Sequence, residues 1–227
     1  MIPALNEEEH IANCIIEVKK QIKNSEIIIA DGNSSDKTRE ISKNLGAKVI
    51  IEKTKTVSAA RDTGLRTASG DVVVFIDADV LPAPGWFEKI TKPFDNPNIV
   101  AVAGMPTPLD GSFSERFGMK LIFGIFAEIC FKFQTPLVTG QVMAVRRKQA
   151  IEAGGFDHTH KSGEDTYIFL LLKKKGLIIH TDATVIVSTR RIRNWGMLKY
   201  LQFNIRNWYS LLRYNKPVND DYEPVRK

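Results

Sequence analysis

The chain has 227 residues, of which 43% are hydrophobic, so it can bury a full core, most simply as one domain with an appendage. Its net charge of +6 and pI near 9.2 favour anionic partners such as nucleotides, phospholipid headgroups or nucleic acid. The basic residues are not clustered in one arm and no nucleic-acid motif occurs, so we do not expect a nucleic-acid partner.

The two cysteines predict a reducing compartment. Cys14 and Cys130 lie in neither a metal-binding nor a redox spacing, and both are expected to be ordinary buried thiols. Glu7, Glu8 and Glu9 follow the first residues at once, so we expect no signal peptide.

The first third of the chain alternates between helical and strand patterns. Asn6 precedes a helical pattern, and residues 7–9 would place acidic side chains in its first turn, where they favour the helix dipole. Alternating strands and helices predict an α/β fold with a doubly wound, mostly parallel, Rossmann-like sheet. Strands are expected over 26–30, 49–51 and 72–76, and helices over 36–45 and 58–67.

The first strand of such a sheet would be very short, because only Met1 and Ile2 precede Pro3. Either coding sequence continues upstream or the sheet accepts a stub at this position.

The second half carries two long apolar patterns. Residues 117–133 are almost wholly apolar and predict a core helix or one lying in a membrane interface, being too short and too charged for a confident membrane span. Residues 196–214 form an amphipathic helical tail. Between these two segments we expect strands over 142–145, 177–179 and 183–187, and helices over 148–153 and 164–175.

Two aspartates follow the most strand-like segment. Asp77-Ala78-Asp79 comes directly after the apolar run 72–76, where open α/β sheets bind ligands. Side chains two apart share one face of a strand, so Asp77 and Asp79 can converge on a hard cation such as Mg²⁺ or Mn²⁺. The alternative is that these aspartates simply end a strand and open a loop.

Further motifs accompany this pair in a fixed order, and together they resemble the family 2 glycosyltransferases with the GT-A fold. The set spans residues 3 to about 175 and consists of Pro3-Ala4-Leu5-Asn6-Glu7-Glu8, residues 30–38 (ADGNSSDKT), residues 58–64 (SAARDTG), Gly70-Asp71 with Asp77-Ala78-Asp79, Gly154-Gly155-Phe156 and Gly163-Glu164-Asp165.

The resemblance implies a site for a nucleotide-diphosphate sugar and a divalent metal. It gives Asp165 the role of catalytic base with Glu164 beside it, and Asp79 that of direct metal ligand with Asp77 nearer the ribose or a metal-bound water. Asp31 would accept a hydrogen bond from the donor's base. The remaining donor contacts implied are Pro3, Ala4, Asn6, Glu7, Arg61, Asp77 and Ala78.

Each of these residues also has a structural explanation that the sequence leaves open. Asp31 could belong to a turn that leads into a helix capped by Asp36. Arg61 could lie on a helix surface. Glu164 and Asp165 could be first-turn acids favoured by a helix dipole.

The chain departs from the family pattern after its last expected strand. Where many members have a histidine, this chain has Ser188-Thr189-Arg190-Arg191, so Arg190 would help to hold the diphosphate and the third protein ligand of the metal stays open. The Gln-x-x-Arg-Trp signature of processive synthases does not occur, which favours single addition.

The resemblance predicts an inverting transfer to an acceptor hydroxyl or phosphate, in glycan, glycolipid or cell-surface polysaccharide synthesis. The alternatives are a nucleotidyltransferase or a non-catalytic, membrane-surface scaffold that binds sugar nucleotides. We expect a catalytic domain over residues 1–190, with a nucleotide-sugar half (1–104) and an acceptor half (105–190), followed by a helical tail (191–227).

The tail suggests where the protein works. Its aliphatic stripe, its basic residues and its aromatic residues suit the cytoplasmic face of a membrane, where it would meet a lipid-linked or otherwise anchored acceptor. The alternative is that the stripe packs on the catalytic domain or forms a dimer; the sequence leaves the oligomeric state open.

Overall fold

The computed structural model describes residues 1–22, 25–109, 112–188 and 190–218, without the side chains of residues 114, 115, 190 and 191. The strands are β1 (Ile2–Ala4), β2 (Ile28–Asp31), β3 (Lys48–Ile51), β4 (Val72–Ile76), β5 (Leu81–Pro82), β6 (Ile99–Pro108), β7 (Val142–Arg146) and β8 (Leu177–Val187). The helices are α1 (Ile11–Gln21), α2 (Thr38–Asn44), α3 (Val57–Thr67), α4 (Trp86–Thr91), α5 (Phe113–Met119), α6 (Ala127–Lys132), α7 (Arg147–Glu152), α8 (Glu164–Leu172), α9 (Arg190–Trp195) and α10 (Met197–Tyr214), with a 3₁₀ turn η1 (Lys92–Asp95) and a π-helical segment η2 (Lys120–Phe126).

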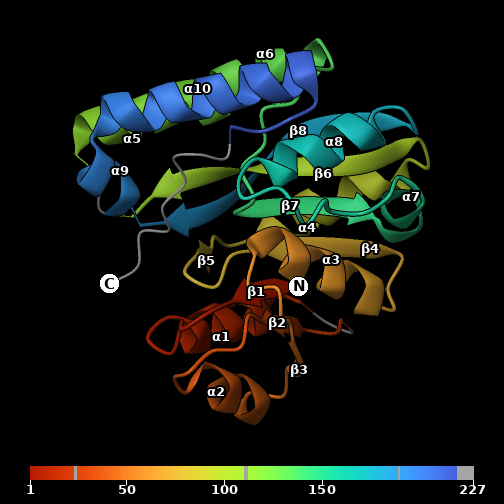
Figure 1. Cartoon of the computed structure of the whole chain (residues 1–227), viewed down its shortest axis with the longest axis vertical. Coiled ribbons are helices and arrows are strands. Elements are labelled where there is room, and N and C mark those ends of the chain that lie inside the picture. The colour runs from red at the N-terminus through yellow and green to blue at the C-terminus, as the bar shows by residue number, and fades with distance from the viewer. Residues whose placement is uncertain (23–24, 110–111, 189, 219–227) are drawn as a thin grey trace.

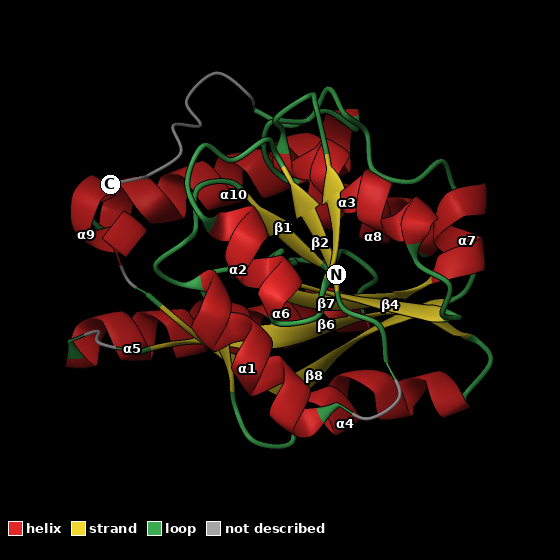
Figure 2. Ribbon diagram, turned by 90° about the horizontal axis from the view of Figure 1, so that it is seen from below, coloured by secondary structure: helices red, strands yellow, loops and turns green. Residues whose placement is uncertain are grey.

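The strands form two hydrogen-bonded groups, with the orders β1-β2-β3 and β4-β7-β6-β8-β5 (Figure 1). β1, β2 and β3 are parallel to one another, as are β6 and β8, whereas β7 runs antiparallel to both β4 and β6. β5 is antiparallel to β8. Helices cover both faces of these strands (Figures 1 and 2). The expected α/β class with a doubly wound, mostly parallel sheet is therefore confirmed.

The short first strand joins the two groups. The Met1 nitrogen donates to the Val74 carbonyl at 2.8 Å, and the Ile76 N–H donates to the Met1 carbonyl at 3.2 Å. Ile2 and Ala4 are buried in the core, and the strand pairs in register with β2 on its other side. β1 thus brings β2 and β3 alongside β4.

The first helix begins later than the sequence predicted. α1 starts at Ile11, and no acidic side chain lies in its first turn, so the expectation for Glu7 to Glu9 was wrong. The reason is tertiary: Asn6 has a left-handed backbone with φ of 55°, and the Glu7 and Glu8 N–H groups donate to Thr38 and Asp36. This loop therefore serves as a contact to the β2–α2 loop instead of as a helical turn.

Two strand boundaries also differ from the expectation. β6 was not predicted, although it is the long strand that pairs with both β7 and β8. The segments expected at 177–179 and 183–187 are one strand, β8, whose register with β6 shifts between Ala103 and Met105. An irregularity of this kind interrupts the sequence pattern without ending the strand.

The two long apolar patterns lie together on one side of the sheet (Figure 1). The segment expected at 117–133 is a continuous helical run from α5 through η2 to α6, in which Glu128 and Lys132 form an ion pair at 3.2 Å. α10 lies alongside this run, and the Phe126 and Trp208 rings meet at 5.9 Å. Among the described residues, no helix is long and apolar enough to cross a membrane.

Candidate active site

Arg61 is the centre of the site. α3 begins at a Thr56 N-cap, whose side chain accepts from the Ala59 N–H at 3.1 Å, and this helix carries the arginine into the protein, where it is only 2% exposed. Its guanidinium forms an ion pair with Glu164, and it donates to Asp77 Oδ1 at 2.9 Å and to the Gly140 carbonyl at 2.8 Å. Arg61 is therefore not a surface residue, because it links three segments far apart in the sequence.

Gly140 gives the guanidinium its space. A Cβ atom at this position would overlap Arg61, so only a glycine allows the loop before β7 to approach so closely. Gly140 was not predicted as a site residue. The signal available was modest: a single glycine directly before a strand pattern, which can mark a close backbone approach.

Glu164 and Asp165 open α8, after Gly163 turns the chain with a φ of 70°. Glu164 and Asp165 both line the cavity. The Glu164 side chain is also buried against Arg61, and Asp165 Oδ1 accepts from the Thr166 N–H at 2.6 Å. Burial, and then the neighbouring Glu164 carboxylate, raise the pKa of Asp165 to about 7, although Arg61 opposes the shift. A carboxylate whose pKa lies near neutrality can accept a proton at physiological pH.

Asp77 and Asp79 lie where predicted, after the carboxyl end of β4, and both line the same cavity. The Cys14 thiol donates to the Asp77 carbonyl at 3.5 Å and holds this turn against α1. Burial raises the pKa of Asp77 to about 6, with Arg61 opposing and Asp79 adding to the shift. Both cysteines are buried free thiols, as expected.

The aspartate pair suits part of a metal site. Two carboxylates on one loop are the protein share that Mg²⁺ or Mn²⁺ commonly takes, the other positions being filled by substrate phosphates and water. Among the described residues there is no group of three or more His, Cys, Asp or Glu side chains that could hold a metal ion. The chain therefore fits a cation that is shared with a bound diphosphate better than one held by protein ligands alone.

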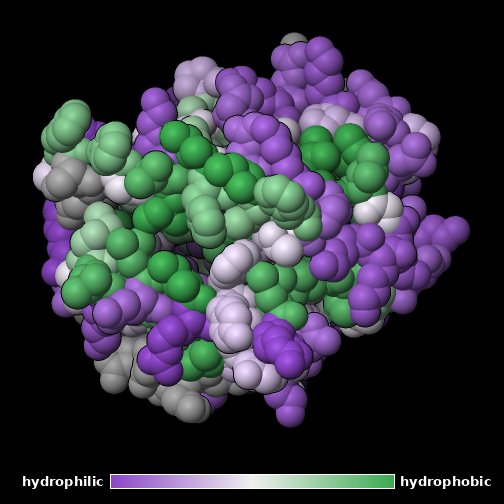
Figure 3. Space-filling model, turned by 90° about the horizontal axis from the view of Figure 1, so that it is seen from above, coloured by the Kyte–Doolittle hydropathy of each residue, from purple (hydrophilic) through white to green (hydrophobic). Residues whose placement is uncertain are grey.

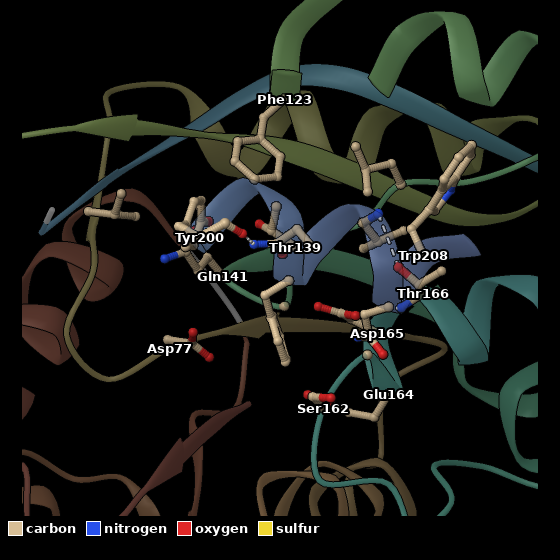
Figure 4. A pocket seen from close by; sticks show the side chains of 18 of the residues that line it. Asp77, Phe123, Thr139, Gln141, Ser162, Glu164, Asp165, Thr166, Tyr200 and Trp208 are labelled. Atoms are coloured by element: carbon tan, nitrogen blue, oxygen red, sulfur yellow. Dashed lines mark hydrogen bonds between the residues drawn. The ribbon is translucent and has the colours of Figure 1, made fainter. Parts of the chain in front are cut away.

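The acidic groups line one side of a cavity of about 220 Å³ (Figure 4). The opposite wall comes from α10 and from the α5–η2 run, including Phe123, Tyr200, Asn204 and Trp208. The helical tail was expected to be an appendage, so these residues were not predicted as part of the site. No local pattern could have found them, because they reach the acids only through the packing of helices.

The packing of α10 on the site is specific. Gly163 allows Asn207 and Leu211 to approach so closely that a Cβ atom at position 163 would overlap the Asn207 side chain. Asn207 in turn accepts from the Val218 N–H at 2.9 Å, and the Trp208 indole N–H donates to the Pro136 carbonyl at 3.1 Å. These contacts seat α10 directly against the glycine that precedes Glu164.

The loops expected to hold the nucleotide form a second polar network. Asp31 is 0% exposed, and its carboxylate accepts from both the N–H and the hydroxyl of Ser34, at 2.8 Å and 2.5 Å. The Ser34 hydroxyl also accepts from the Asn6 N–H at 2.9 Å, and the Asn6 side chain accepts from the Ser35 N–H at 2.8 Å. The turn that the sequence left open as an alternative for Asp31 is therefore present.

This network lies apart from the cavity. Asp31 and residues 3–7 do not appear in the cavity lining, so the structure brings together Arg61, Asp77, Asp79 and Asp165 but leaves the donor-side loops beside them. Asp36 accepts from the Thr38 N–H at 2.9 Å, but the N-cap of α2 is Lys37, so the capping role considered for Asp36 was wrong.

The Gly154-Gly155-Phe156 motif packs against α3 beside Arg61. Gly155 has a φ of 76° and packs against Asp62, the neighbour of Arg61 on α3. The buried Asp62 carboxylate accepts from the Phe156 N–H at 3.1 Å and forms an ion pair with Arg66 at 2.8 Å. Arg190 is the first residue of α9, but its side chain lies outside the described residues.

The amino-acid sequence is similar to those of several known proteins. Residues 1–155 match the model of glycosyl transferase family 2. Glycosyltransferase AglE of Haloferax volcanii is 30% identical over 217 residues, covering 90% of this chain and 70% of the relative. The pre-mycofactocin glycosyltransferase of Mycobacterium tuberculosis is 30% identical over 150 residues, which cover 62% of this chain but only 32% of that protein.

A solved structure shares the fold. The mannosyltransferase PcManGT from Pyrobaculum calidifontis, in complex with GDP-Man and Mn²⁺, superposes with a TM-score of 0.74 at 19% identity. The alignment covers 95% of this chain and 64% of that structure. The chain thus spans about two thirds of the length of PcManGT and about one third of the length of the pre-mycofactocin glycosyltransferase.

Proposed function

Because the chain belongs to glycosyl transferase family 2, we propose that it transfers a sugar from a nucleotide-diphosphate sugar to an acceptor hydroxyl or phosphate, with inversion at the anomeric carbon. The observation that carries this proposal is the convergence of Asp77, Asp79 and Asp165 on one cavity, where Arg61 links the first of them to Glu164. These segments are distant in sequence, and one side chain holds them together.

Asp165 is the proposed base. It takes the proton from the acceptor hydroxyl while the acceptor oxygen attacks the anomeric carbon, and the bond to the diphosphate breaks with its electron pair on the leaving group. A single displacement of this kind inverts the anomeric centre. The raised pKa of Asp165, about 7, supports the role because such a group both ionises and accepts protons near neutrality.

Glu164 has a different proposed role. Its carboxylate is buried and committed to Arg61, so it is a positioning residue that acts through the arginine and not a second base. Arg61 in turn orients Asp77 through Oδ1. Both residues hold the acidic groups of the cavity in place before substrates bind.

A divalent cation, Mg²⁺ or Mn²⁺, is the proposed cofactor, with Asp79 as its direct protein ligand and Asp77 beside it, at the ribose or a metal-bound water. When bound, it would neutralise the charge that develops on the departing diphosphate. The complex of PcManGT with Mn²⁺ and GDP-Man supports this assignment by family likeness. Arg190 is a further proposed contact of the diphosphate.

The donor nucleotide is proposed to lie along Pro3, Ala4, Asn6 and Glu7, with its base at Asp31 and its ribose beside Asp77 and Ala78. Asp31 already accepts from Ser34, and an oxygen of a carboxylate can accept more than one hydrogen bond. The donor would thus bridge the two polar regions of the molecule, with its base in the loop network and its diphosphate at the mouth of the cavity.

The acceptor side is proposed to take one sugar at a time, in glycan, glycolipid or cell-surface polysaccharide synthesis. The division into a nucleotide-sugar half (1–104), an acceptor half (105–190) and a tail (191–227) stays part of this proposal. The mixed wall of the cavity, with acids on one side and Phe123, Tyr200 and Trp208 on the other, supports an acceptor with both polar and apolar parts.

A screen of nucleotide sugars tests the proposed function. UDP-sugars and GDP-sugars are incubated with the protein and Mn²⁺, without acceptor, and release of the nucleoside diphosphate is measured. Slow hydrolysis of at least one sugar nucleotide, abolished by a chelator, is the expected result. Asp79→Asn should weaken nucleotide binding by about ten- to a hundredfold with Mn²⁺ and much less without it. Failure to bind any nucleotide sugar would overturn the proposal, and binding with no turnover would favour a non-catalytic scaffold.

A further inference from the structure

Two helical segments lie side by side over the cavity and share one outer surface. The first is the run α5–η2–α6, and the second is α10; Phe126 and Trp208 meet between them, and Gly118 lies against Met197. Both segments turn one side inward, since Phe123 of η2 and Asn204 of α10 line the cavity.

The outer side of the first segment carries an unbroken apolar row at every fourth position. Its members are exposed by 46% to 79% and are Phe113, Phe117, Leu121, Ile125, Ile129 and Phe133. An α-helix turns by about 100° per residue, so a row at every fourth position would drift around a purely α-helical rod. The more loosely wound π segment η2 reduces that drift and keeps the row on one side.

α10 continues the apolar surface. Its exposed apolar and aromatic side chains are Leu198, Ile205, Tyr209 and Tyr214. We call the six-residue row and these four side chains together the two-helix face. Figure 3 views the molecule from this side and shows hydrophobic side chains gathered across it. Large contiguous apolar surfaces of this kind mark interaction sites.

The charge of the two segments is positive. The sequence of α5 to α6 contains three basic residues and two acids, and one of these acids, Glu128, is paired with Lys132. The sequence of α10 contains three basic residues and no acid. Lys120, Lys199 and Arg206 are exposed, so basic groups accompany the apolar side chains.

We propose that the two-helix face is a docking surface for an anionic membrane. Apolar side chains flanked by basic ones, on helices too short or too polar to span a bilayer, are the arrangement that binds lipid headgroups and the acyl chains just beneath them. The aromatic rings of Tyr209 and Tyr214 suit the same boundary.

The inner side of the same helices connects the docking surface to the cavity. η2 and α10 form both the apolar wall of the cavity and the docking face, so the cavity would lie close to the bilayer. A lipid-linked acceptor could then offer its polar end to Asp165 without leaving the membrane. This part of the inference rests on the proposed function, whereas membrane docking itself does not.

Vesicle flotation tests the docking surface. The full chain should bind vesicles that contain phosphatidylglycerol at low salt, bind them less at high salt, and bind pure phosphatidylcholine weakly. Two variants remove apolar groups that are already exposed, so they should fold normally. Each should lower partitioning by about tenfold or more; the variants are Leu121→Gln/Ile125→Gln and Leu198→Gln/Ile205→Gln.

Matched substitutions elsewhere serve as controls. Ile51→Gln/Leu177→Gln removes two aliphatic groups of similar exposure, 51% and 48%, on other surfaces and should leave vesicle binding unchanged. Removing three basic residues that accompany the face should lower binding to anionic vesicles by about a hundredfold. The same change at three lysines on other elements should lower it less. The two triple variants are Lys120→Gln/Lys199→Gln/Arg206→Gln and Lys43→Gln/Lys148→Gln/Lys174→Gln.

Three results would overturn the inference. The first is no flotation at low salt, and the second is flotation that the face variants do not reduce. The third is a dimer in vesicle-free solution that the face variants convert to monomer, which would identify a second copy of the chain as the occupant. Asp165→Asn should float like the parent protein, so a failure of the proposed catalysis and a failure of docking can be told apart.

Discussion

The donor-side loops and the cavity beneath α10 are both polar sites, but they are built in opposite ways. In the donor-side loops, the contacts between Asn6 and Ser34 or Ser35 span 28 or 29 residues and involve small side chains and backbone N–H groups. In the cavity, Arg61 reaches Gly140 across 79 residues and Glu164 across 103.

Because the two regions are built differently, substitutions in them should affect different properties of the protein. Short loops that bind each other through backbone groups give a preformed cradle, whose loss weakens folding and donor binding. A buried arginine that joins three distant segments sets the relative positions of several acids at once. Changes in the first region should therefore leave the chemical step largely intact, whereas changes in the second should reach the chemistry directly.

The largest effect is expected from Asp165→Asn. The amide keeps the size of the carboxylate but cannot accept the proton of the acceptor, so kcat should fall by about two to four orders of magnitude. The affinity for the donor, measured by calorimetry with Mn²⁺, should stay close to that of the parent. As a control, Asp95→Asn changes an exposed aspartate in η1 and should leave both quantities unchanged. Near-normal turnover of Asp165→Asn would remove the residue from the reaction.

Gly140→Ala should disturb the cavity at its centre. The added methyl group overlaps the Arg61 guanidinium, which is buried and ion-paired and cannot easily retreat. We expect unfolding free energy to fall by about 1–3 kcal/mol, together with a loss of turnover. Gly70→Ala, whose Cβ would meet only an ordinary contact at 3.5 Å, should change stability by less than about 0.5 kcal/mol. Equal midpoints of urea unfolding for the two variants would contradict the close packing of Gly140 on Arg61.

Ser34→Ala probes the donor-side loops. It removes the hydroxyl that donates to the buried Asp31 carboxylate and accepts from the Asn6 N–H, so we expect a loss of about 1–3 kcal/mol in unfolding free energy. Nucleotide affinity should fall as well, while the pH dependence of turnover stays the same. Ser35→Ala is the milder comparison, because its exposed hydroxyl donates only to Asn6 Oδ1 at 3.3 Å, and it should lower the unfolding free energy less than Ser34→Ala. A shifted pH profile in Ser34→Ala would mean that the two regions are not separable.

Glu164→Gln should have the most specific effect, a shift in the pH dependence of turnover. The pKa of Asp165 is about 7, so kcat/KM should rise with pH up to that region and then level off, because the ionised form is the base. Removing the Glu164 charge takes away a cause that raises the pKa of Asp165 and leaves the opposing Arg61, so the midpoint should move to lower pH. An unchanged midpoint, measured with a saturating metal concentration, would argue that Glu164 does not act on Asp165.

Much of this protein could be predicted from local sequence. The apolar run of β4 ends directly at Asp77 and Asp79, and both were expected at one site because parallel strands deliver their carboxyl ends to one edge of a sheet. The order of strands and helices follows from hydrophobic periodicity, which depends only on near neighbours. The turn at Asp31 was one of two interpretations that the sequence left open, because an Asx turn needs only residues three apart.

Tertiary structure alone decided the rest. The acids at 7–9 lie outside the first turn of α1, because the Glu7 and Glu8 N–H groups bind Thr38 and Asp36. The amphipathic tail forms a wall of the cavity because Gly163 lets α10 approach α8. The partners of Arg61 likewise lie beyond the reach of any local pattern. Sequence periodicity determines which face of a segment is apolar, but the partner of that face depends on where distant segments pack, and this is settled only in the folded chain.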